Sequence, residues 1–230
     1  MKINIIYEDN SVIVLEKVRA VASQNDNTGD KSMFDYIQEH IKNKVYAVHR
    51  LDRPVGGIMV FAKTSKAASF ISEQINKGEF KKEYIAVLCG KHDKKEGTLE
   101  NYIIKNQRMN ISRITDKGHK GAKKALLSYN ILDECEDLDY GVLSLASINL
   151  KTGRHHQIRV QFMSCGTPLW GDTKYNDMFK RKAGFTYIAL WSYKIGFVLP
   201  NTKEKAVFSI NPPNEFPFNC FEFFNGQRFC

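Results

Sequence analysis

Residues 49–57, with the sequence HRLDRPVGG, constrain the fold of this chain more than any other segment. One carboxylate, Asp52, stands between Arg50 and Arg53, and a proline and two glycines follow it. The proline fixes one φ angle, and the glycines allow conformations that a side chain would forbid. An apolar run over residues 57–62 comes next and predicts a buried strand. The segment therefore predicts a charged turn before a core strand, which is either a functional site or a loop ion pair.

A second segment, residues 151–159 with the sequence KTGRHHQIR, is equally dense in polar groups and also contains a glycine. Residues 154–163 predict a short helix, in which Ile158 and Phe162 pack inward four residues apart. Two such polar clusters in one chain favour a common pocket.

Four motifs resemble those of the RluA family of RNA pseudouridine synthases and occur in the family's order. They are HRLD at residues 49–52, KEYIA at residues 82–86, GRHHQIR at residues 153–159 and GTPLWGDTKY at residues 166–175. The resemblance extends from about residue 6 to about residue 213 and so covers nearly the whole chain.

The resemblance implies an α+β fold, with a mixed, mostly antiparallel central sheet flanked by helices and loops. It implies one pseudouridine-synthase-like catalytic domain over residues 1–230, without a separate N-terminal RNA-binding domain. It also implies an isomerase that converts a specific uridine in structured RNA, either tRNA or rRNA, to pseudouridine. That reaction exchanges a C–N bond for a C–C bond without redox change, so no cofactor is expected. The target base must leave its stack and enter a shielded, basic cleft.

The resemblance gives three residues a role in catalysis. Asp52 would be the catalytic carboxylate, acting either as a nucleophile or as a base. Arg159, the last residue of the third motif, would lie against Asp52 and favour its ionised form. Tyr84 would offer a ring that stacks on the uracil and a hydroxyl near the reaction. The alternatives are a structural Asp–Arg bridge and a plain core tyrosine.

Basic side chains are expected to bind the RNA. Arg50 would fill the space left by the flipped nucleotide, because a planar guanidinium stacks on bases. Residues 105–124 hold seven basic side chains against the single acid Asp116, and the chain has a formal net charge of +9. This segment predicts a loop or hairpin that contacts an RNA backbone, with a solvated protrusion as the alternative. The residues expected to bind RNA are Arg50, Arg53, Lys105, Arg108, Arg113, Lys120, Lys123, Lys124 and Arg154.

Periodicity and capping residues predict the first elements. Two short β-type runs joined by a polar turn predict an opening hairpin over residues 3–15. Ser32 begins a pattern with helical spacing that runs to residue 41. Residues 64–77 predict a second helix. The inward residues of this helix and its stop are predicted to be Ala68, Ile71, Ile75 and Gly78.

Further strands are predicted along the rest of the chain. They cover residues 84–88, 140–150, 187–191, 193–198 and 206–210. Between them, the acidic residues 133–139 predict an exposed turn. The phenylalanine-rich tail, residues 216–229, predicts packing along a core edge rather than base stacking.

Bulk properties exclude several classes of protein. No apolar run approaches the roughly 20 residues that span a membrane. No signal peptide is visible, so we expect a cytoplasmic protein, and we expect it to be a monomer. The five cysteines lack CxxC spacing, and His49, His155 and His156 lack an accompanying ligand set. No metal site is therefore expected, and hydrogen bonding suits the histidines better.

The chain departs from the family pattern at two places. Val55-Gly56-Gly57 stands where Thr-Ser-Gly is usual, which removes two hydroxyl groups but keeps the small size. Residues 17–20, KVRA, replace the usual Lys-Pro-x-Gly turn and put the local loop shape in doubt.

Two other functions stay open. The first is a non-catalytic RNA-binding or RNA-folding protein on the same scaffold, favoured by the net charge and the altered turn. The second is a hydrolase such as a nucleosidase, which would use Asp52 with Asp172 or Glu83 as a carboxylate pair.

Overall fold

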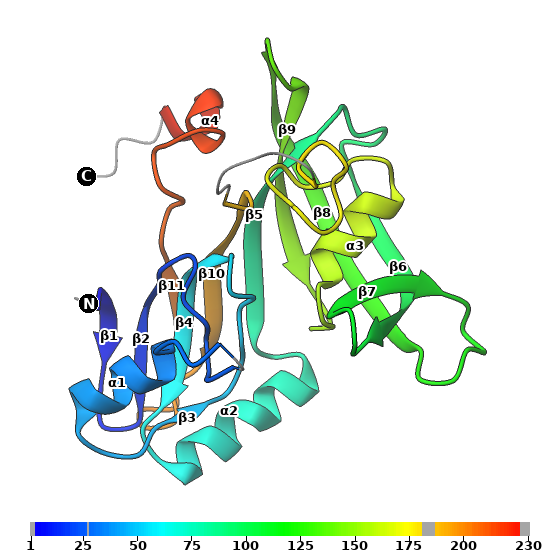
Figure 1. Cartoon of the computed structure of the whole chain (residues 1–230). Helices are drawn as coiled ribbons and strands as arrows, with labels where there is room; N and C mark the ends of the chain where they lie inside the picture. Colours follow the sequence, from blue (N-terminus) through cyan, green and yellow to red (C-terminus); the bar gives the residue numbers. More distant parts are fainter. Residues whose placement is uncertain (1–2, 27, 181–186, 226–230) are drawn as a thin grey trace. The chain divides into compact units, whose positions relative to one another are not determined.

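The computed structural model describes residues 3–26, 28–180 and 187–225 (Figure 1). The chain divides into two compact units. Unit 1 comprises residues 1–83 and 191–211, and unit 2 comprises residues 84–190 and 212–230. The prediction of one catalytic domain over the whole chain stays a prediction.

The strands of unit 1 form a mixed sheet. β1 and β4 flank β2, and β10 follows β4 and carries β11 on its other side, while the short β3 pairs with part of β4. The β4–β10 pair is parallel, and the other pairs are antiparallel. The bounds are β1 (Ile5–Glu8), β2 (Val12–Lys17), β3 (Tyr46–Ala47), β4 (Gly56–Ala62), β10 (Leu190–Val198) and β11 (Lys205–Ser209).

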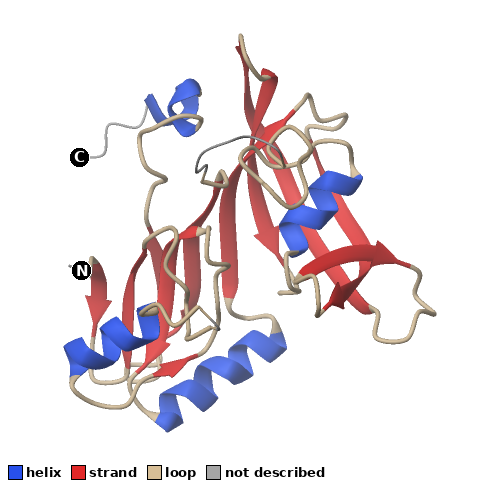
Figure 2. Ribbon diagram, in the orientation of Figure 1, coloured by secondary structure: helices blue, strands red, loops and turns tan. Residues whose placement is uncertain are grey.

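Local capping explains both helices of unit 1, which Figure 2 shows beside these strands. Helix α1 (Met33–Ile41) starts with a reciprocal capping box between Ser32 and Asp35, as predicted. Helix α2 (Ser65–Lys77) starts at the Thr64 cap. It ends at Gly78, whose φ is 72°.

The predicted inner face of α2 is wrong by one position at its start. The buried side chains are Ala67, Ile71 and Gln74, whereas Ala68 is only half-buried. Gln74 replaces the expected Ile75 as the buried residue because its side-chain amide pairs with the Val198 backbone in both directions. Ile75 still packs at the border of the core. That core consists of Val12, Val14, Ile58, Val60, Ile71, Phe80, Ile195, Phe197 and Leu199.

The strands of unit 2 lie in the order β5, β9, β8, β6 and β7, and the β9–β8, β8–β6 and β6–β7 pairs are antiparallel. Helix α3 (Gln157–Ser164) has Ile158 and Phe162 buried, as predicted. The bounds of the strands are β5 (Lys81–Cys89), β6 (Glu96–Asn106), β7 (Ile111–Thr115), β8 (Lys123–Asp137) and β9 (Gly141–Leu150). The mixed, mostly antiparallel strands with flanking helices confirm the α+β class.

Two predicted segments of the chain differ from the structure. The acidic residues 133–137 belong to β8 and pair with β9, so the exposed turn is confined to residues 138–140. Cross-strand pairing there overrides the turn-like composition. The runs over residues 187–191 and 193–198 contribute to one strand, β10, rather than to two.

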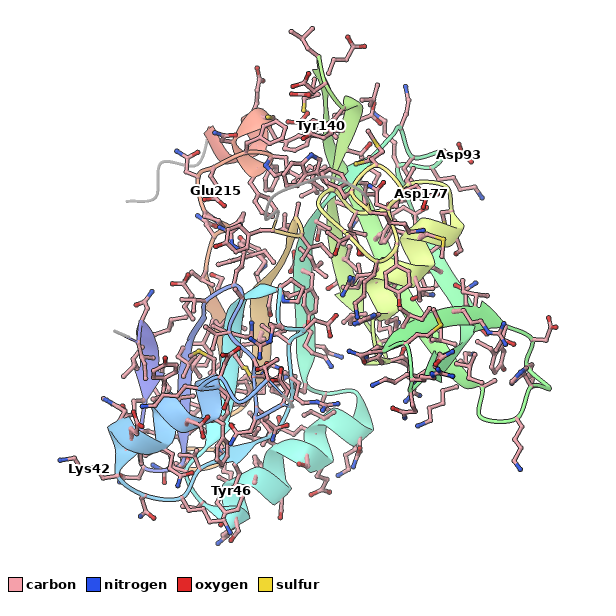
Figure 3. The ribbon with its side chains drawn as sticks, in the orientation of Figure 1. Lys42, Tyr46, Asp93, Tyr140, Asp177 and Glu215 are labelled. Atoms are coloured by element: carbon pink, nitrogen blue, oxygen red, sulfur yellow. The ribbon has the colours of Figure 1, made fainter. Side chains whose placement is uncertain are left out.

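Part of the described aromatic tail packs as expected, whereas Phe223 is exposed. Tyr140, labelled in Figure 3, contacts Trp170, Phe179 and Phe216 through its ring. Phe218, in the short helix η1 (Phe218–Cys220), and Phe221, which directly follows η1, are both buried. Helix α4 (Glu222–Asn225) comes next. The Phe224 side chain and residues 226–230 lie outside the described part. No helix of the described residues is long and apolar enough to cross a membrane.

Candidate active site

The Asp52 turn, residues 51–55 of unit 1, has its backbone fixed at both ends. The Ser23 hydroxyl donates to the Leu51 carbonyl at 2.7 Å and accepts the Leu51 N–H at 3.0 Å. The turn closes where the Asp52 carbonyl accepts the Val55 N–H at 3.0 Å. Leu51 and Val55 are buried, whereas Asp52 is half-buried. The turn therefore holds its apolar neighbours in the core and leaves the Asp52 side chain partly open to solvent.

Lys17, the last residue of β2, is fully buried and binds the same turn. Its Nζ donates to the carbonyl oxygens of Val55 at 2.6 Å, Arg53 at 3.1 Å and Val18 at 3.2 Å. These three acceptors match the three N–H donors of an ammonium group. Burial lowers the pKa of Lys17 to about 7, and the negative charge of Asp52 opposes that shift. In the sequence, the only sign of this role is a lysine at the end of an apolar run.

Gly56 and Gly57 stand where β4 meets β10 in parallel, opposite Trp191 and Ser192. A Cβ at Gly56 would overlap the Trp191 ring, and a Cβ at Gly57 would overlap the Ser192 backbone. Gly57 also has a φ of 114°, which L side chains rarely adopt. The close approach of β10 therefore explains glycine at both positions of this chain.

The two arginines beside Asp52 have different surroundings. Arg53 lies half-buried and binds Asp26 through Nη2 at 2.8 Å and Asp30 through Nη1 at 2.9 Å. Arg50 is exposed. Arg53 therefore secures the loop that carries Asp26 and Asp30, and its predicted contact with RNA stays a prediction.

His49, the first residue of the same motif, belongs to the interior of unit 1. Its Nε2 accepts the Val60 N–H at 3.1 Å, and its ring lies 5.4 Å from the Phe80 ring. Burial lowers the pKa of His49 to about 3, with a smaller contribution from the charge of Lys82. His49 is therefore neutral at physiological pH. Among the described residues, no group of three or more His, Cys, Asp and Glu side chains is placed to hold a metal ion.

In unit 2, Arg159 of α3 forms a buried two-point ion pair with Asp172. The Arg159 Nε–H donates to Asp172 Oδ2 at 2.8 Å, and Nη2 donates to Oδ1 at 2.7 Å. Both side chains are almost fully buried. The Tyr175 ring lies 5.2 Å from the guanidinium carbon. The sequence predicts Asp52 as the partner of Arg159; that contact would join the two units and stays a prediction.

Two histidines connect the start of α3 to β7. The Tyr175 hydroxyl accepts the Ser112 N–H at 2.6 Å and lies 2.9 Å from His156 Nδ1. The His155 ring stacks on that of His156, and its Nδ1 lies 2.8 Å from the Ser112 hydroxyl. Burial, followed by the charge of Arg159, lowers the pKa of His156 to about 2. These contacts agree with the structural role expected for both histidines.

The loop before α3 is held by Gln157. The Gln157 Oε1 accepts from the Thr152 hydroxyl at 2.8 Å and from the Arg154 N–H at 3.0 Å. Arg154 is exposed, and its Nε–H donates to the Lys124 carbonyl at 2.8 Å. This loop therefore places a basic side chain next to the start of β8.

Tyr84 is buried in β5 of unit 2. Both faces of its strand are covered, because residues 84–89 are all buried. Its predicted place against the uracil stays a prediction.

The predicted basic segment is a hairpin followed by a loop. β6 and β7 form the hairpin, and residues 116–122 connect β7 to β8. All seven basic side chains of this segment are exposed, and Lys124 pairs with Glu100 at 2.7 Å. The seven residues are Lys105, Arg108, Arg113, Lys117, Lys120, Lys123 and Lys124.

Comparisons of the sequence with known proteins identify its relatives. A family model described as RNA pseudouridylate synthase matches residues 11–164. The tRNA pseudouridine synthase C of Haemophilus ducreyi is 29% identical over 226 residues, which cover 91% of this chain and 90% of the relative. The ribosomal large subunit pseudouridine synthase D of Borreliella burgdorferi is 32% identical over 206 residues, which cover 84% of this chain and 60% of the relative.

Solved structures support the fold. Human RNA Pseudouridylate Synthase Domain Containing 1 has a TM-score of 0.77 at 21% identity, covering 96% of this chain and 88% of its own. Human RNA Pseudouridylate Synthase Domain Containing 4 has a TM-score of 0.73 at 18% identity, covering 91% of this chain and 88% of its own. The fold and the family match together define an RNA pseudouridylate synthase. The chain belongs to the RluA family of these enzymes, as its motifs predict, and is therefore an isomerase.

Proposed function

We propose that the protein converts a specific uridine in tRNA or rRNA to pseudouridine, with Asp52 as its catalytic carboxylate. Relatives named for tRNA and for the large ribosomal subunit support these two classes of RNA. The observation that carries the proposal is the anchoring of the Asp52 turn by Ser23 and Lys17. A carboxylate that must meet one ribose or base needs such a fixed backbone, because small misplacements cost large factors in rate.

In this proposal, Arg159 and Tyr84 complete the site around Asp52. The guanidinium of Arg159 favours the ionised carboxylate, which then acts as a nucleophile or as a base. Tyr84 stacks on the target uracil. Arg50 fills the space that the flipped nucleotide leaves, and its exposure suits a side chain that inserts into RNA. Cytoplasmic localisation and a monomeric state stay predictions.

The carboxylates available to a hydrolase argue against that alternative. Asp172 is 1% exposed and is paired with Arg159 through both oxygens. Glu83 accepts from Lys194 Nζ at 3.1 Å. A glycosidase-type mechanism needs a second carboxyl group that protonates a leaving group or activates water. Neither candidate meets this need without breaking an ion pair.

The proposal is tested by mapping pseudouridine in total RNA. Four strains are compared: wild type, a deletion, and deletions complemented with Asp52→Asn or Asp93→Asn. Asp93 is an exposed carboxylate outside the proposed catalytic group and outside the basic segment, and it provides the matched control. We expect one or a few pseudouridine sites to vanish in the deletion and in Asp52→Asn, and to persist in Asp93→Asn.

Two outcomes would contradict the proposal. If Asp52→Asn restores every site that the deletion loses, Asp52 is not the catalytic carboxylate. If the deletion loses no site while wild-type cells contain the protein, the alternative of a non-catalytic RNA-binding protein replaces it. The site that disappears would also identify the RNA and the uridine.

A further inference from the structure

The Arg159 guanidinium is held in one orientation by two kinds of contact. It donates through Nε and Nη2, two neighbouring groups on one edge, to both oxygens of Asp172. Such a two-point pair fixes the plane of the guanidinium as well as its position. The Tyr175 ring, 5.2 Å from the guanidinium carbon, provides a second constraint.

Asp172 is itself fixed by the backbone around it. Its Oδ1 accepts the N–H groups of Lys174 at 2.9 Å and Tyr175 at 3.1 Å, in addition to the Arg159 contact. Gly171, with φ of 74°, precedes it, and a Cβ there would overlap the Tyr187 carbonyl. The carboxylate therefore cannot rotate without breaking hydrogen bonds to its own loop. Residues 171–175 fix the orientation of the Asp172 carboxylate, and the carboxylate in turn fixes the orientation of the Arg159 guanidinium.

The pair also balances charge in the interior of unit 2. A buried arginine keeps its proton, so its charge needs a counter-charge, and Asp172 provides it along the edge formed by Nε and Nη2. The same contact therefore fixes both the charge and the direction of the guanidinium.

We propose that Asp172 is the positioning residue for Arg159, which it aims through the two-point contact, with the Tyr175 ring as its second support. This inference rests on the proposed function, in which Arg159 acts at the Asp52 carboxylate. Asp172 does not touch the substrate in this account. Its effect on the reaction passes through Arg159 alone.

The test compares Asp172→Asn with the matched control Asp177→Asn. Asp177 lies in the same loop region, is labelled in Figure 3 and is 88% exposed. Asparagine keeps an oxygen for the loop N–H groups but cannot accept both Arg159 donors as a carboxylate does. Single-turnover rates are measured with the RNA that mapping identifies, together with RNA affinity. We expect Asp172→Asn to lower the rate constant by about 100-fold while the Kd for RNA changes less than twofold. Asp177→Asn should change neither.

A double-mutant cycle separates positioning from a general structural role. In the Arg159→Met background, Asp172→Asn should lower the rate by less than threefold, since there is no longer a guanidinium to aim. An equal fall in both backgrounds would overturn the proposal. So would an Asp172→Asn rate within threefold of wild type, provided that wild type is active and Asp52→Asn is not. An inactive wild type would instead count against the proposed function.

A measurement on the wild-type protein covers the case in which Asp172→Asn does not fold. The Arg159 Nε–H signal, assigned by its loss in Arg159→Lys, should exchange with solvent at least 100-fold more slowly than that of exposed Arg113. Tyr175→Leu, which removes the ring support, should increase this exchange rate. Exchange of the wild-type Arg159 signal as fast as that of Arg113 would overturn the positioning role, whatever the catalytic activity.

Discussion

At the scale of single residues, the position of Gly57 imposes two constraints that only glycine among the amino acids satisfies. Its φ lies in a region that side chains avoid, and the Ser192 backbone leaves no space for a Cβ. Glycine at this position, which the family pattern shares, is therefore explained by a strand that lies 135 positions further along the chain. That approach cannot be inferred from the turn alone, because it depends on the pairing of β4 with β10.

We predict that Gly57→Ala lowers the free energy of unfolding by about 3–5 kcal/mol, because backbone strain and overlap add. Gly118→Ala is the matched control, since a Cβ there meets nothing within 4 Å. Urea unfolding followed by circular dichroism measures both variants. If Gly57→Ala lowers the free energy of unfolding no more than Gly118→Ala does, then β10 moves aside to accommodate the added methyl group, and the prediction is wrong.

Lys17 gives a second prediction at this scale. Lys17→Met keeps the length of the side chain but leaves the Arg53 and Val55 carbonyls without their donor. Each buried acceptor left unpaired costs about 1–3 kcal/mol, and the Asp52 turn loses its tie to β2. We expect a lower unfolding midpoint and a single-turnover rate reduced at least tenfold. Lys66→Met, at an exposed position of α2, controls for the loss of a lysine. An unchanged rate in Lys17→Met would separate the Asp52 turn from catalysis.

At the scale of elements, the sequence predicts best what is decided locally. Ser32 and Thr64 begin their helices, and Gly78 ends α2, through contacts within a few residues, so the sequence predicts both helices of unit 1 nearly in full. The length of β8 is missed because the pairing of residues 133–137 with β9 outweighs four acidic residues in that segment. The Arg159–Asp172 pair is missed for a related reason: the motifs name both residues, but only the folded loop brings them together.

The β6–β7 hairpin carries the prediction that belongs to this scale. Replacing three exposed basic side chains, Lys105, Arg108 and Arg113, with glutamine should weaken RNA binding and flatten its dependence on salt. A plot of the logarithm of the RNA-binding constant against the logarithm of the salt concentration has a negative slope. The size of this slope should decrease by up to about 0.9 for each phosphate that the protein no longer neutralises. The matched control replaces Lys66, Lys94 and Lys205, which are exposed elsewhere. Equal slopes for both triple variants would assign binding to net charge rather than to the hairpin.

At the scale of the whole molecule, each unit contains a buried histidine that folding keeps neutral. His49 lies in unit 1 and His156 in unit 2, with pKa values of about 3 and about 2 against an ordinary value near 6.5. Between about pH 6 and 3 the unfolded chain therefore binds two protons that the folded chain does not. Stability must fall as the pH falls through this window, because protonation favours the unfolded state.

The expected slope is at most about 1.4 kcal/mol per pH unit for each histidine, and it develops below pH 6.5. The carboxylates with lowered pKa values add to the loss only near pH 4.5 and below; they are Glu8, Asp9, Asp26, Asp35 and Glu73. Urea unfolding between pH 6 and 5 therefore isolates the histidines, because Lys17, whose pKa is lowered to about 7, is largely charged in both states there. Burial also lowers the pKa of His92 in unit 2, so His92 contributes a further part of the slope. His49→Gln and His156→Asn should each remove one part of the slope, whereas His119→Gln, at an exposed loop position, should remove none. If the two units unfold in separate transitions, each replacement should flatten the pH dependence of its own unit only. A slope that neither replacement reduces would show that His49 and His156 do not cause the pH dependence.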